Sequence, residues 1–277
     1  MMRATMALPA TVETEAARRA LGDVVPRLVA LVRSIRDPQA PALGEWNAAD
    51  VAMHLAHVWE VLPSLVAGER EPFLGGVEEL AGLTTSLVRG EEGRDLEEIA
   101  ARIERGAAAY LATPIPEETA RPWMVRGSAL PPSSFACHML NESLVHGFDV
   151  ARSQGLPWRI DPAYAGMAIL GFLFPALSVV DPRFPVRQEK AAGVHASFDI
   201  RVRGAGSVHM LLQDGALTIT PPGPRRVDCH LSGEATTLFL LIWGRTGQWR
   251  GVLTGRLLSW GRRPWLAARL PSMLRNP

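Results

Sequence analysis

The segment SSFACHMLNESLVHGFDVARSQ, residues 133–154, constrains the fold more than any other part of the chain. Its apolar residues recur with the period of an α-helix, and His138, Glu142 and His146 are spaced four apart on one helical stripe. Glu142 and His146 can together hold one divalent metal ion through a carboxylate oxygen and an imidazole nitrogen. Polar residues at this spacing are also typical of a solvated helix face. A metal site therefore requires a third ligand from another helix.

Three earlier segments also have helical periodicity. We expect helices over residues 11–36, 47–68 and 94–113, with Asn47 as the N-cap of the second and Gly68 at its end. Residues 69–93 are glycine-rich and indicate a long loop with a short helix. Four helices with a long connection favour a four-helix bundle, in which metal ligands project inward from facing helices. His54, on the second helix, can then meet Glu142 and His146.

The pattern of apolar and charged residues changes after residue 160. Residues 162–180 carry no charge and could span a bilayer by length, but flanking aspartates and internal Gly and Pro favour a helix buried between two domains. Alternation over 194–202, a hairpin over 207–223 with Asp214-Gly215 at its turn, and a strand over 225–233 precede helices at 233–245 and 263–274. The predicted class is α+β, with a bundle domain 1–160, a connection 161–186 and an α+β domain 187–277.

Charge and cysteine content exclude several classes of protein. The formal net charge is +1, which gives no global attraction to nucleic acid. Residues 235–277 hold seven arginines and no acid, interleaved with four tryptophans, Trp243, Trp249, Trp260 and Trp265. This pattern fits either a basic exterior around an apolar core or a surface for anionic membranes. Two distant cysteines, and an N-terminus without a signal-peptide pattern, favour a cytoplasmic protein. We expect Cys137 in the core, and Cys229 and His230 on opposite strand faces.

Three motifs carry a resemblance to a known family: WNAADVAMHLAH (residues 46–57), ESLVHGFDVA (142–151) and LSGEATTLFLLIWGR (231–245). With them the chain resembles the mycothiol-dependent maleylpyruvate isomerase family, in which a DinB-like bundle precedes a domain similar to sterol-carrier protein 2. The resemblance implies a divalent metal, usually zinc, held by His54, Glu142 and His146, with mycothiol as thiol cosubstrate in an actinobacterial host. It also implies two catalytic residues, Asp149 to orient a ligand and Arg245 to hold an anionic substrate group.

The expected function is therefore activation of a low-molecular-weight thiol at the metal for addition to an electrophilic small molecule, giving cis–trans isomerisation or S-transfer. One alternative is a carrier of a hydrophobic ligand with a structural or vestigial metal, and another is a metal-sensing regulator. His57 or His138 could supply a fourth ligand and close the site, although an additional histidine is more often a hydrogen-bonded helix residue. We expect small molecules as partners, no nucleic acid, no integral membrane segment, and a monomer or homodimer.

Overall fold

The structure, a computed structural model, describes residues 5–6, 8, 11–114 and 120–275. Contacts within this part divide it into two compact units, one of residues 12–160 and one of residues 161–275 with the described residues of 5–11. The connection predicted over residues 161–186 lies with the second unit by these contacts. The predicted domain limits stay a prediction.

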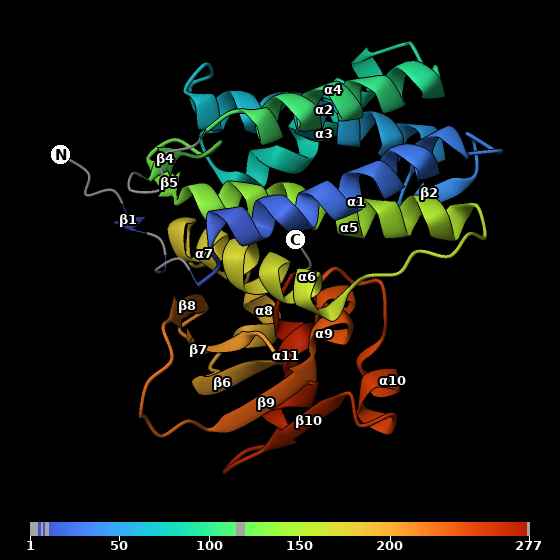
Figure 1. The fold of residues 1–277 in the computed structure, drawn as a ribbon. Helices are drawn as coiled ribbons and strands as arrows, with labels where there is room; N and C mark the ends of the chain where they lie inside the picture. The colour runs from blue at the N-terminus through green and yellow to red at the C-terminus, as the bar shows by residue number, and fades with distance from the viewer. Residues whose placement is uncertain (1–4, 7, 9–10, 115–119, 276–277) are drawn as a thin grey trace. The chain divides into compact units, whose positions relative to one another are not determined.

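The first unit is a helical bundle of α1 (Thr14–Arg33), α2 (Ala48–Ala67), α4 (Leu96–Ala112) and α5 (Pro132–Ser153) (Figure 1). Helix α1 packs on α4 and α5, and α2 packs on the same two helices, so each helix has two neighbours around one seam. Short elements complete the unit: β2 (Pro41–Leu43), β3 (Trp46–Asn47), a 3₁₀ turn (Val77–Glu79), α3 (Leu80–Gly90), β4 (Arg121–Pro122) and β5 (Ser128–Leu130).

Local sequence signals explain where α2 begins and ends. The Asn47 side chain accepts a hydrogen bond from the Asp50 backbone N–H, and the Asp50 carboxylate accepts one from the Asn47 N–H, which completes a capping box. Gly68 ends the helix in the left-handed conformation, with φ of 75°. The predicted helix over 47–68 is confirmed in both position and caps. This fixes the rotation of the helix that carries His54.

Helix α5 is buried on nearly its whole circumference, which the polar stripe seen in the sequence did not predict. Its buried polar residues are Ser133, Ser134, His138, Asn141, Glu142, Ser143, His146 and Asp149. Polar groups in such surroundings must find partners, because an unpaired buried donor or acceptor costs about 1–3 kcal/mol. The hydrogen-bond partners of these buried residues define the candidate site.

The second unit holds a five-stranded sheet in the order β10-β9-β6-β7-β8. Its strands are β6 (Ala196–Arg203), β7 (Gly206–Gln213), β8 (Ala216–Thr220), β9 (Cys229–Glu234) and β10 (Leu257–Trp260). The β6–β9 pair is parallel and the other pairs are antiparallel. The predicted hairpin turn is confirmed, since Asp214 and Gly215 have φ of 52° and 72°.

Helices of the second unit are α6 (Pro162–Met167), α7 (Phe174–Val179), α8 (Gln188–Ala191), α9 (Ala235–Ile242), α10 (Gln248–Leu253) and α11 (Leu266–Met273). A π-helical stretch, Ala168–Leu173, joins α6 to α7. Together these three form the apolar stretch Pro162–Val179, which is long and apolar enough to cross a membrane but is 67% buried in the structure. Its residues Leu173, Phe174 and Leu177 line a cavity within the second unit, which accounts for part of its apolar character.

The two faces of the sheet differ as the strand alternation predicts. Phe198, Ile200 and Val202 of β6 are buried in the core, whereas Asp199 and Arg201 lie on the other face. On that face the carboxylate of Asp199 lies 2.9 Å from Nδ1 of His230 and accepts a bond from Arg201. Cys229 is fully buried while the side chain of His230 is partly exposed, so the prediction that these neighbours face opposite ways is confirmed.

Candidate metal centre

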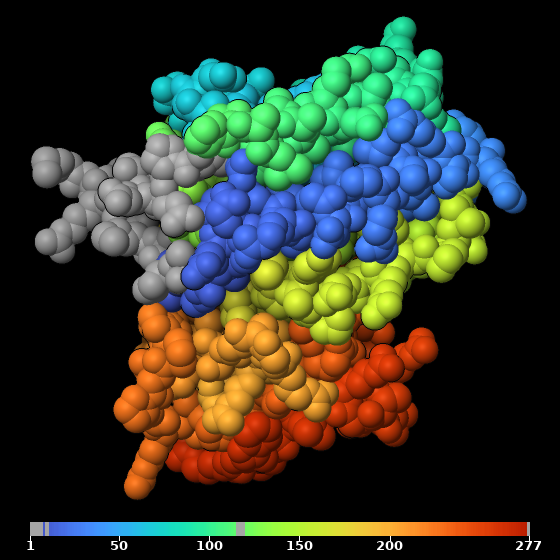
Figure 2. Space-filling model, in the orientation of Figure 1, coloured from blue at the N-terminus to red at the C-terminus, as the bar shows by residue number. Residues whose placement is uncertain are grey.

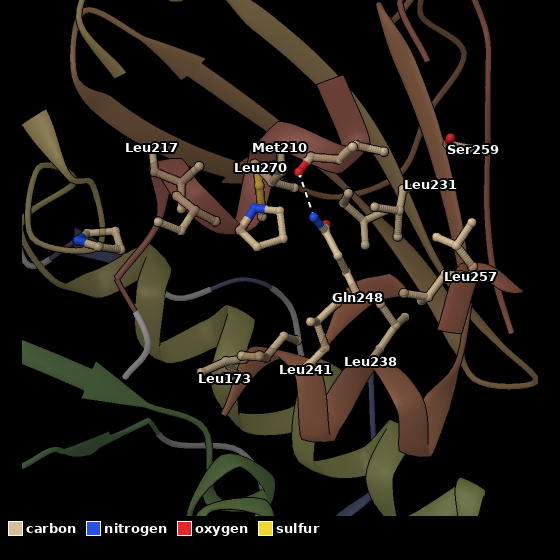
Figure 3. Close-up of a pocket in the computed structure, with 18 of the residues that line it drawn as sticks. Leu173, Met210, Leu217, Leu231, Leu238, Leu241, Gln248, Leu257, Ser259 and Leu270 are labelled. Carbon is tan, nitrogen blue, oxygen red and sulfur yellow. Dashed lines mark hydrogen bonds between the residues drawn. The ribbon is translucent and has the colours of Figure 1, made fainter. Parts of the chain in front are cut away.

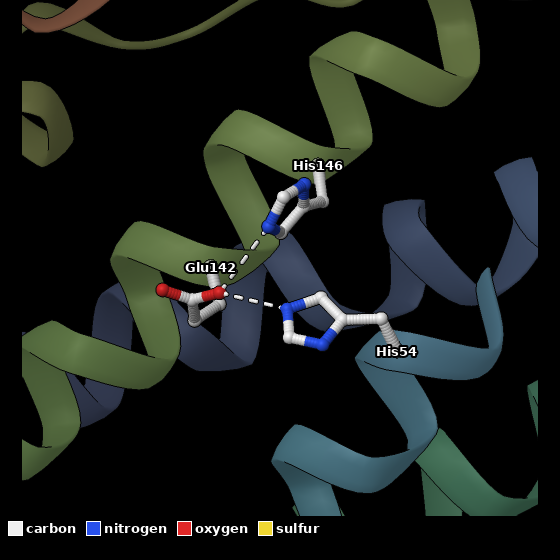
Figure 4. A group of neighbouring side chains, drawn as sticks. All are labelled: His54, Glu142 and His146. Atoms are coloured by element: carbon white, nitrogen blue, oxygen red, sulfur yellow. Dashed lines mark hydrogen bonds and ion pairs between the residues drawn. The ribbon is translucent and has the colours of Figure 1, made fainter. Parts of the chain in front are cut away.

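Helices α2 and α5 bring three chemically matched side chains to one point. His54 comes from the middle of α2, and Glu142 and His146 come from successive turns of α5, with all three directed toward one another (Figure 4). Each can offer one ligand atom, and these three atoms lie within 4.8 Å of one another. The group joins residues 54 and 142, far apart in sequence, across the seam between two packed helices.

The distances suit a small divalent ion. The Oε2 atom of Glu142 lies 3.2 Å from Nε2 of His54 and 3.3 Å from Nε2 of His146. Ligand atoms about 2.0–2.1 Å from a tetrahedral zinc ion are about 3.4 Å apart, so both separations match two edges of such a tetrahedron. Two imidazoles and one carboxylate are a donor set that zinc accepts. The residues present therefore fit a divalent metal, and three protein ligands leave a coordination position for another molecule.

Asp149 determines how the His146 ring is presented. Its Oδ2 atom lies 3.2 Å from Nδ1 of His146, one helical turn further along α5, and its side chain is fully buried. A carboxylate can only accept here, so Nδ1 carries the proton and Nε2 is the nitrogen directed at Glu142. This is the arrangement in which a carboxylate orients a metal-binding histidine.

The second oxygen of Glu142 is held by groups that the sequence did not reveal as partners. Oε1 accepts a hydrogen bond of 3.1 Å from the Asn141 side-chain amide and lies 3.6 Å from Nε2 of His138. The indole N–H of Trp123 can only donate, and it contacts Nδ1 of His138 at 3.5 Å. The proton of His138 is therefore on Nε2, facing Oε1. Glu142 is left with Oε2 as its ligand atom.

Burial and charge shift the pKa values of the three residues in different directions. Burial alone would raise the pKa of Glu142, but hydrogen bonds from His138, His146 and His54 outweigh it and hold that pKa well below the usual range. Desolvation lowers the pKa of His54. Desolvation also opposes the charged form of His146, yet its bonds to Asp149 and Glu142 dominate and raise its pKa to about 9. Without a metal, a charged His146 thus compensates the buried carboxylates.

The additional histidines have other partners. Nε2 of His57 lies 2.7 Å from the Glu91 carboxylate, which also pairs with Arg102, so His57 belongs to a charged network between α2 and α4. His138 faces Oε1 of Glu142 rather than Oε2. Neither histidine contributes a ligand atom to the group of His54, Glu142 and His146.

Neither cysteine is suited to act as a nucleophile. Cys137 is fully buried, as expected, and burial raises its pKa to about 12. Burial likewise raises the pKa of Cys229, which lies in the core of the second unit. A thiolate at neutral pH would have to come from a molecule other than the protein.

Arg245, the other predicted catalytic residue, lies in the second unit, just after α9. Its guanidinium donates a hydrogen bond to the carbonyl of Trp243. Its assignment to an anionic substrate group stays a prediction, as does any catalytic role of Asp149 beyond its contact with His146.

Comparison with known proteins shows which family and which solved structures this chain resembles. Residues 9–151 match the family model described as the mycothiol maleylpyruvate isomerase N-terminal domain. No curated protein matches the chain. A solved mycothiol-dependent maleylpyruvate isomerase is 14% identical, with 86% of this chain and 93% of that one covered and a TM-score of 0.50. A mutant form of that enzyme is 12% identical, with 91% of this chain and 95% of that one covered and a TM-score of 0.49. The UbiJ-SCP2 ubiquinone synthesis protein is 16% identical, with 32% of this chain and 85% of that one covered and a TM-score of 0.26.

The structural likeness at 14% identity concerns the fold alone. It agrees with the observed helical bundle followed by a mixed sheet with helices, and the predicted α+β class is confirmed. The family model covers just over half of the chain, including all three residues of the candidate metal centre. This chain therefore belongs to the mycothiol maleylpyruvate isomerase N-terminal domain family.

Proposed function

We propose that this protein is a metal-dependent enzyme that activates a low-molecular-weight thiol, mycothiol, for addition to an electrophilic small molecule. The observation that carries the proposal is the meeting of His54, Glu142 and His146 within 4.8 Å, with the last two already oriented by buried partners. A divalent ion at this site, zinc by its donor set, would lower the pKa of a bound thiol. Addition to a double bond, rotation and elimination would isomerise a substrate, whereas addition alone would give S-transfer.

The chain's own residues have defined tasks in this proposal. Asp149 keeps the proton of His146 on Nδ1, so that Nε2 faces the metal position. Asn141 and His138 occupy Oε1 of Glu142, so that Oε2 is presented there. Cys137 and Cys229 are buried and poorly acidic, which leaves the nucleophile to an exogenous thiol. The three ligand side chains are themselves mostly buried, since those of His54, Glu142 and His146 are 13%, 11% and 9% exposed.

Elemental analysis and a thiol-dependent assay test the proposal together. We expect about one equivalent of metal in the purified protein, and turnover of maleylpyruvate or a related electrophile only when mycothiol is added. His146→Ala should lose both metal and turnover. His195→Ala is the matched control, since His195 is an exposed histidine of the second unit. Full metal occupancy in His146→Ala would refute the ligand assignment, and thiol-independent turnover would refute the chemistry.

A second candidate function, binding of a hydrophobic small molecule, is supported by a cavity inside the second unit (Figure 3). Its volume is about 540 Å³, within the range of roughly 300–1,000 Å³ that is typical of ligand pockets. The lining is apolar except for Gln248, Ser259 and Arg275. The Gln248 amide N–H donates to the carbonyl of Ala268, which leaves its oxygen able to accept a bond from a ligand.

Displacement of a fluorescent fatty-acid analogue from the full-length protein tests this second candidate. Leu177→Trp should fill part of the cavity and weaken binding of the analogue, because Leu177 lines it. Leu211→Trp is the control, since Leu211 is exposed on the same unit but does not line the cavity. Binding that is equally strong in both variants would place the analogue elsewhere. Metal removal with a chelator should abolish thiol-dependent turnover and leave binding of the analogue intact.

A further inference from the structure

Exposed large apolar side chains are concentrated in one stretch of the second unit. Of the eight large apolar side chains that are exposed in the described part of the chain, six lie within residues 249–265. Five of these form what we call the rim surface: Trp249, Val252, Leu253, Leu258 and Trp265. Their exposed fractions run from 47% for Val252 to 86% for Leu253. Large apolar side chains are grouped in this way where a surface contacts a partner.

The rim surface is continuous with the cavity. Trp249, Val252, Leu258 and Trp265 all line the cavity as well as being exposed. They come from α10, from β10 and from the turn before α11, so three separate parts of the second unit meet at this rim. The α10 segment lies at the surface in the space-filling view (Figure 2). A ligand leaving the cavity at the rim would meet apolar side chains rather than a polar border.

The charges beside the rim surface are positive and unpaired. Arg250 follows Trp249 on α10, Arg256 separates α10 from β10, and Arg275 lines the cavity itself. All three are exposed, and none has an acidic partner within 4 Å among the described residues. By contrast, Arg262 and Arg263 both pair with Asp228. Residues 235–277 contain no acid that could neutralise the rim arginines locally.

We propose that the rim surface docks on the surface of a lipid bilayer that contains anionic lipids, with the cavity mouth facing the membrane. Tryptophan and leucine side chains enter the boundary between headgroups and acyl chains, and arginines bind the phosphates. This goes beyond the metal-dependent function and extends the second candidate, because the bilayer would supply the apolar ligand.

The charged and apolar residues of the rim surface argue against two other partners, a second copy of this chain and a nucleic acid. A second copy seated on the rim surface would bring Arg250 and Arg256 of both copies into one interface, and residues 235–277 supply no acid to neutralise them. A nucleic acid would explain the arginines but would leave Val252, Leu253 and Leu258 exposed to water. An anionic bilayer satisfies both the charged and the apolar residues.

Co-flotation with vesicles tests this inference on the full-length protein. Wild type should bind phosphatidylcholine vesicles that contain phosphatidylglycerol, and it should bind much less to phosphatidylcholine alone or at high salt. Trp249→Ser combined with Leu253→Ser should weaken the partition coefficient more than about tenfold. Arg250→Gln should weaken it about fivefold, and only for the anionic vesicles. The two apolar positions are highly exposed, so their replacement leaves the core intact.

Matched controls make the outcome decisive. Leu87→Ser removes an exposed leucine of the first unit, and Arg126→Gln removes an exposed arginine there. Neither change should alter vesicle binding. The inference is overturned if wild type ignores anionic vesicles, if Leu87→Ser weakens binding as much as the rim variants do, or if the rim variants abolish a concentration-dependent dimer instead. Loss of thiol-dependent turnover in His146→Ala has no bearing on vesicle binding, so the proposals fail separately.

Discussion

At the residue scale, the buried carboxylate of Asp149 decides how well His146 can serve as a ligand. We expect Asp149→Asn to lower the zinc affinity roughly 10–100-fold, because the amide no longer favours the proton on Nδ1 of His146. Competition with a chromogenic chelator measures the affinity. Asp214→Asn is a suitable control, since Asp214 occupies a left-handed turn position that asparagine also accepts. Equal affinities in the two variants would contradict the orienting role.

The raised pKa of His146 makes metal binding depend on pH. In the metal-free protein His146, with a pKa of about 9, carries a proton on Nε2 at neutral pH, and a metal must displace it. Glu142 and His54 have lowered pKa values, so neither releases a proton there. We therefore expect release of about one proton per metal near pH 7, and an apparent affinity that rises about tenfold per pH unit up to about pH 9.

Calorimetry in buffers of different protonation enthalpy measures this proton directly. Asp149→Asn provides the internal check, because loss of that carboxylate lowers the pKa of His146 and reduces the number of protons released. A binding enthalpy that does not depend on the buffer would show that His146 is already deprotonated in the metal-free protein.

Residues at the centre were predictable to different degrees. Helical spacing and the bundle hypothesis brought His54, Glu142 and His146 together, because an α-helix fixes which residues share a stripe. Asn141 was not predicted as a partner of Glu142, although it is the neighbouring residue and fully buried. Trp123 could not have been predicted, since it lies on the segment between β4 and β5, whose position depends on tertiary packing.

At the element scale, Gly106 permits α2 and α4 to cross closely. A Cβ atom added at Gly106 would lie 2.5 Å from the backbone carbonyl oxygen of Trp59, which cannot move without separating the helices. Alanine favours a helix over glycine by up to about 1 kcal/mol, but overpacking costs about 1–3 kcal/mol. We expect Gly106→Ala to lower the midpoint of thermal unfolding by roughly 2–8 °C, as followed by circular dichroism.

Gly22 is the matched control for this substitution. It lies in α1, and an added Cβ atom would meet nothing within 4 Å. Only the helix preference then remains, so Gly22→Ala should raise the midpoint by a few degrees, about 1–4 °C. Similar shifts of the same sign in both variants would mean that the crossing at Trp59 is not as close as the structure shows.

Elements were predictable where a long periodic pattern specified them. The hairpin of β7 and β8 and the helices α2, α4 and α5 follow from alternation, helical period and caps. The sequence did not predict β10 or α10, because Leu257–Trp260 and Gln248–Leu253 are too short to show a period. Strand β10 exists through its pairing with β9, a contact distant in sequence. The Trp- and Arg-rich tail therefore contains the elements that form the rim surface.

At the scale of the whole molecule, the candidate metal centre and the apolar cavity belong to different compact units. The metal centre draws its residues from residues 12–160, and the cavity lies within residues 161–275. The family membership applies to the unit with the metal centre. Because the three metal-centre residues all belong to the first unit and the cavity residues all belong to the second, the stability of each unit can be followed separately when a ligand is added.

Zinc should stabilise the protein through the first unit alone. A metal that binds only the native state stabilises it by about 2.7 kcal/mol at a hundredfold excess over Kd, or roughly 5–10 °C in the unfolding midpoint. Hydrogen exchange should then slow in peptides from α2 and α5, which carry His54, Glu142 and His146, and remain unchanged in β6 to β9. His146→Ala should abolish both effects, while His195→Ala should retain them. Protection gained mainly in the sheet would instead place the metal in the second unit, where Asp199 and His230 already form a carboxylate–imidazole pair.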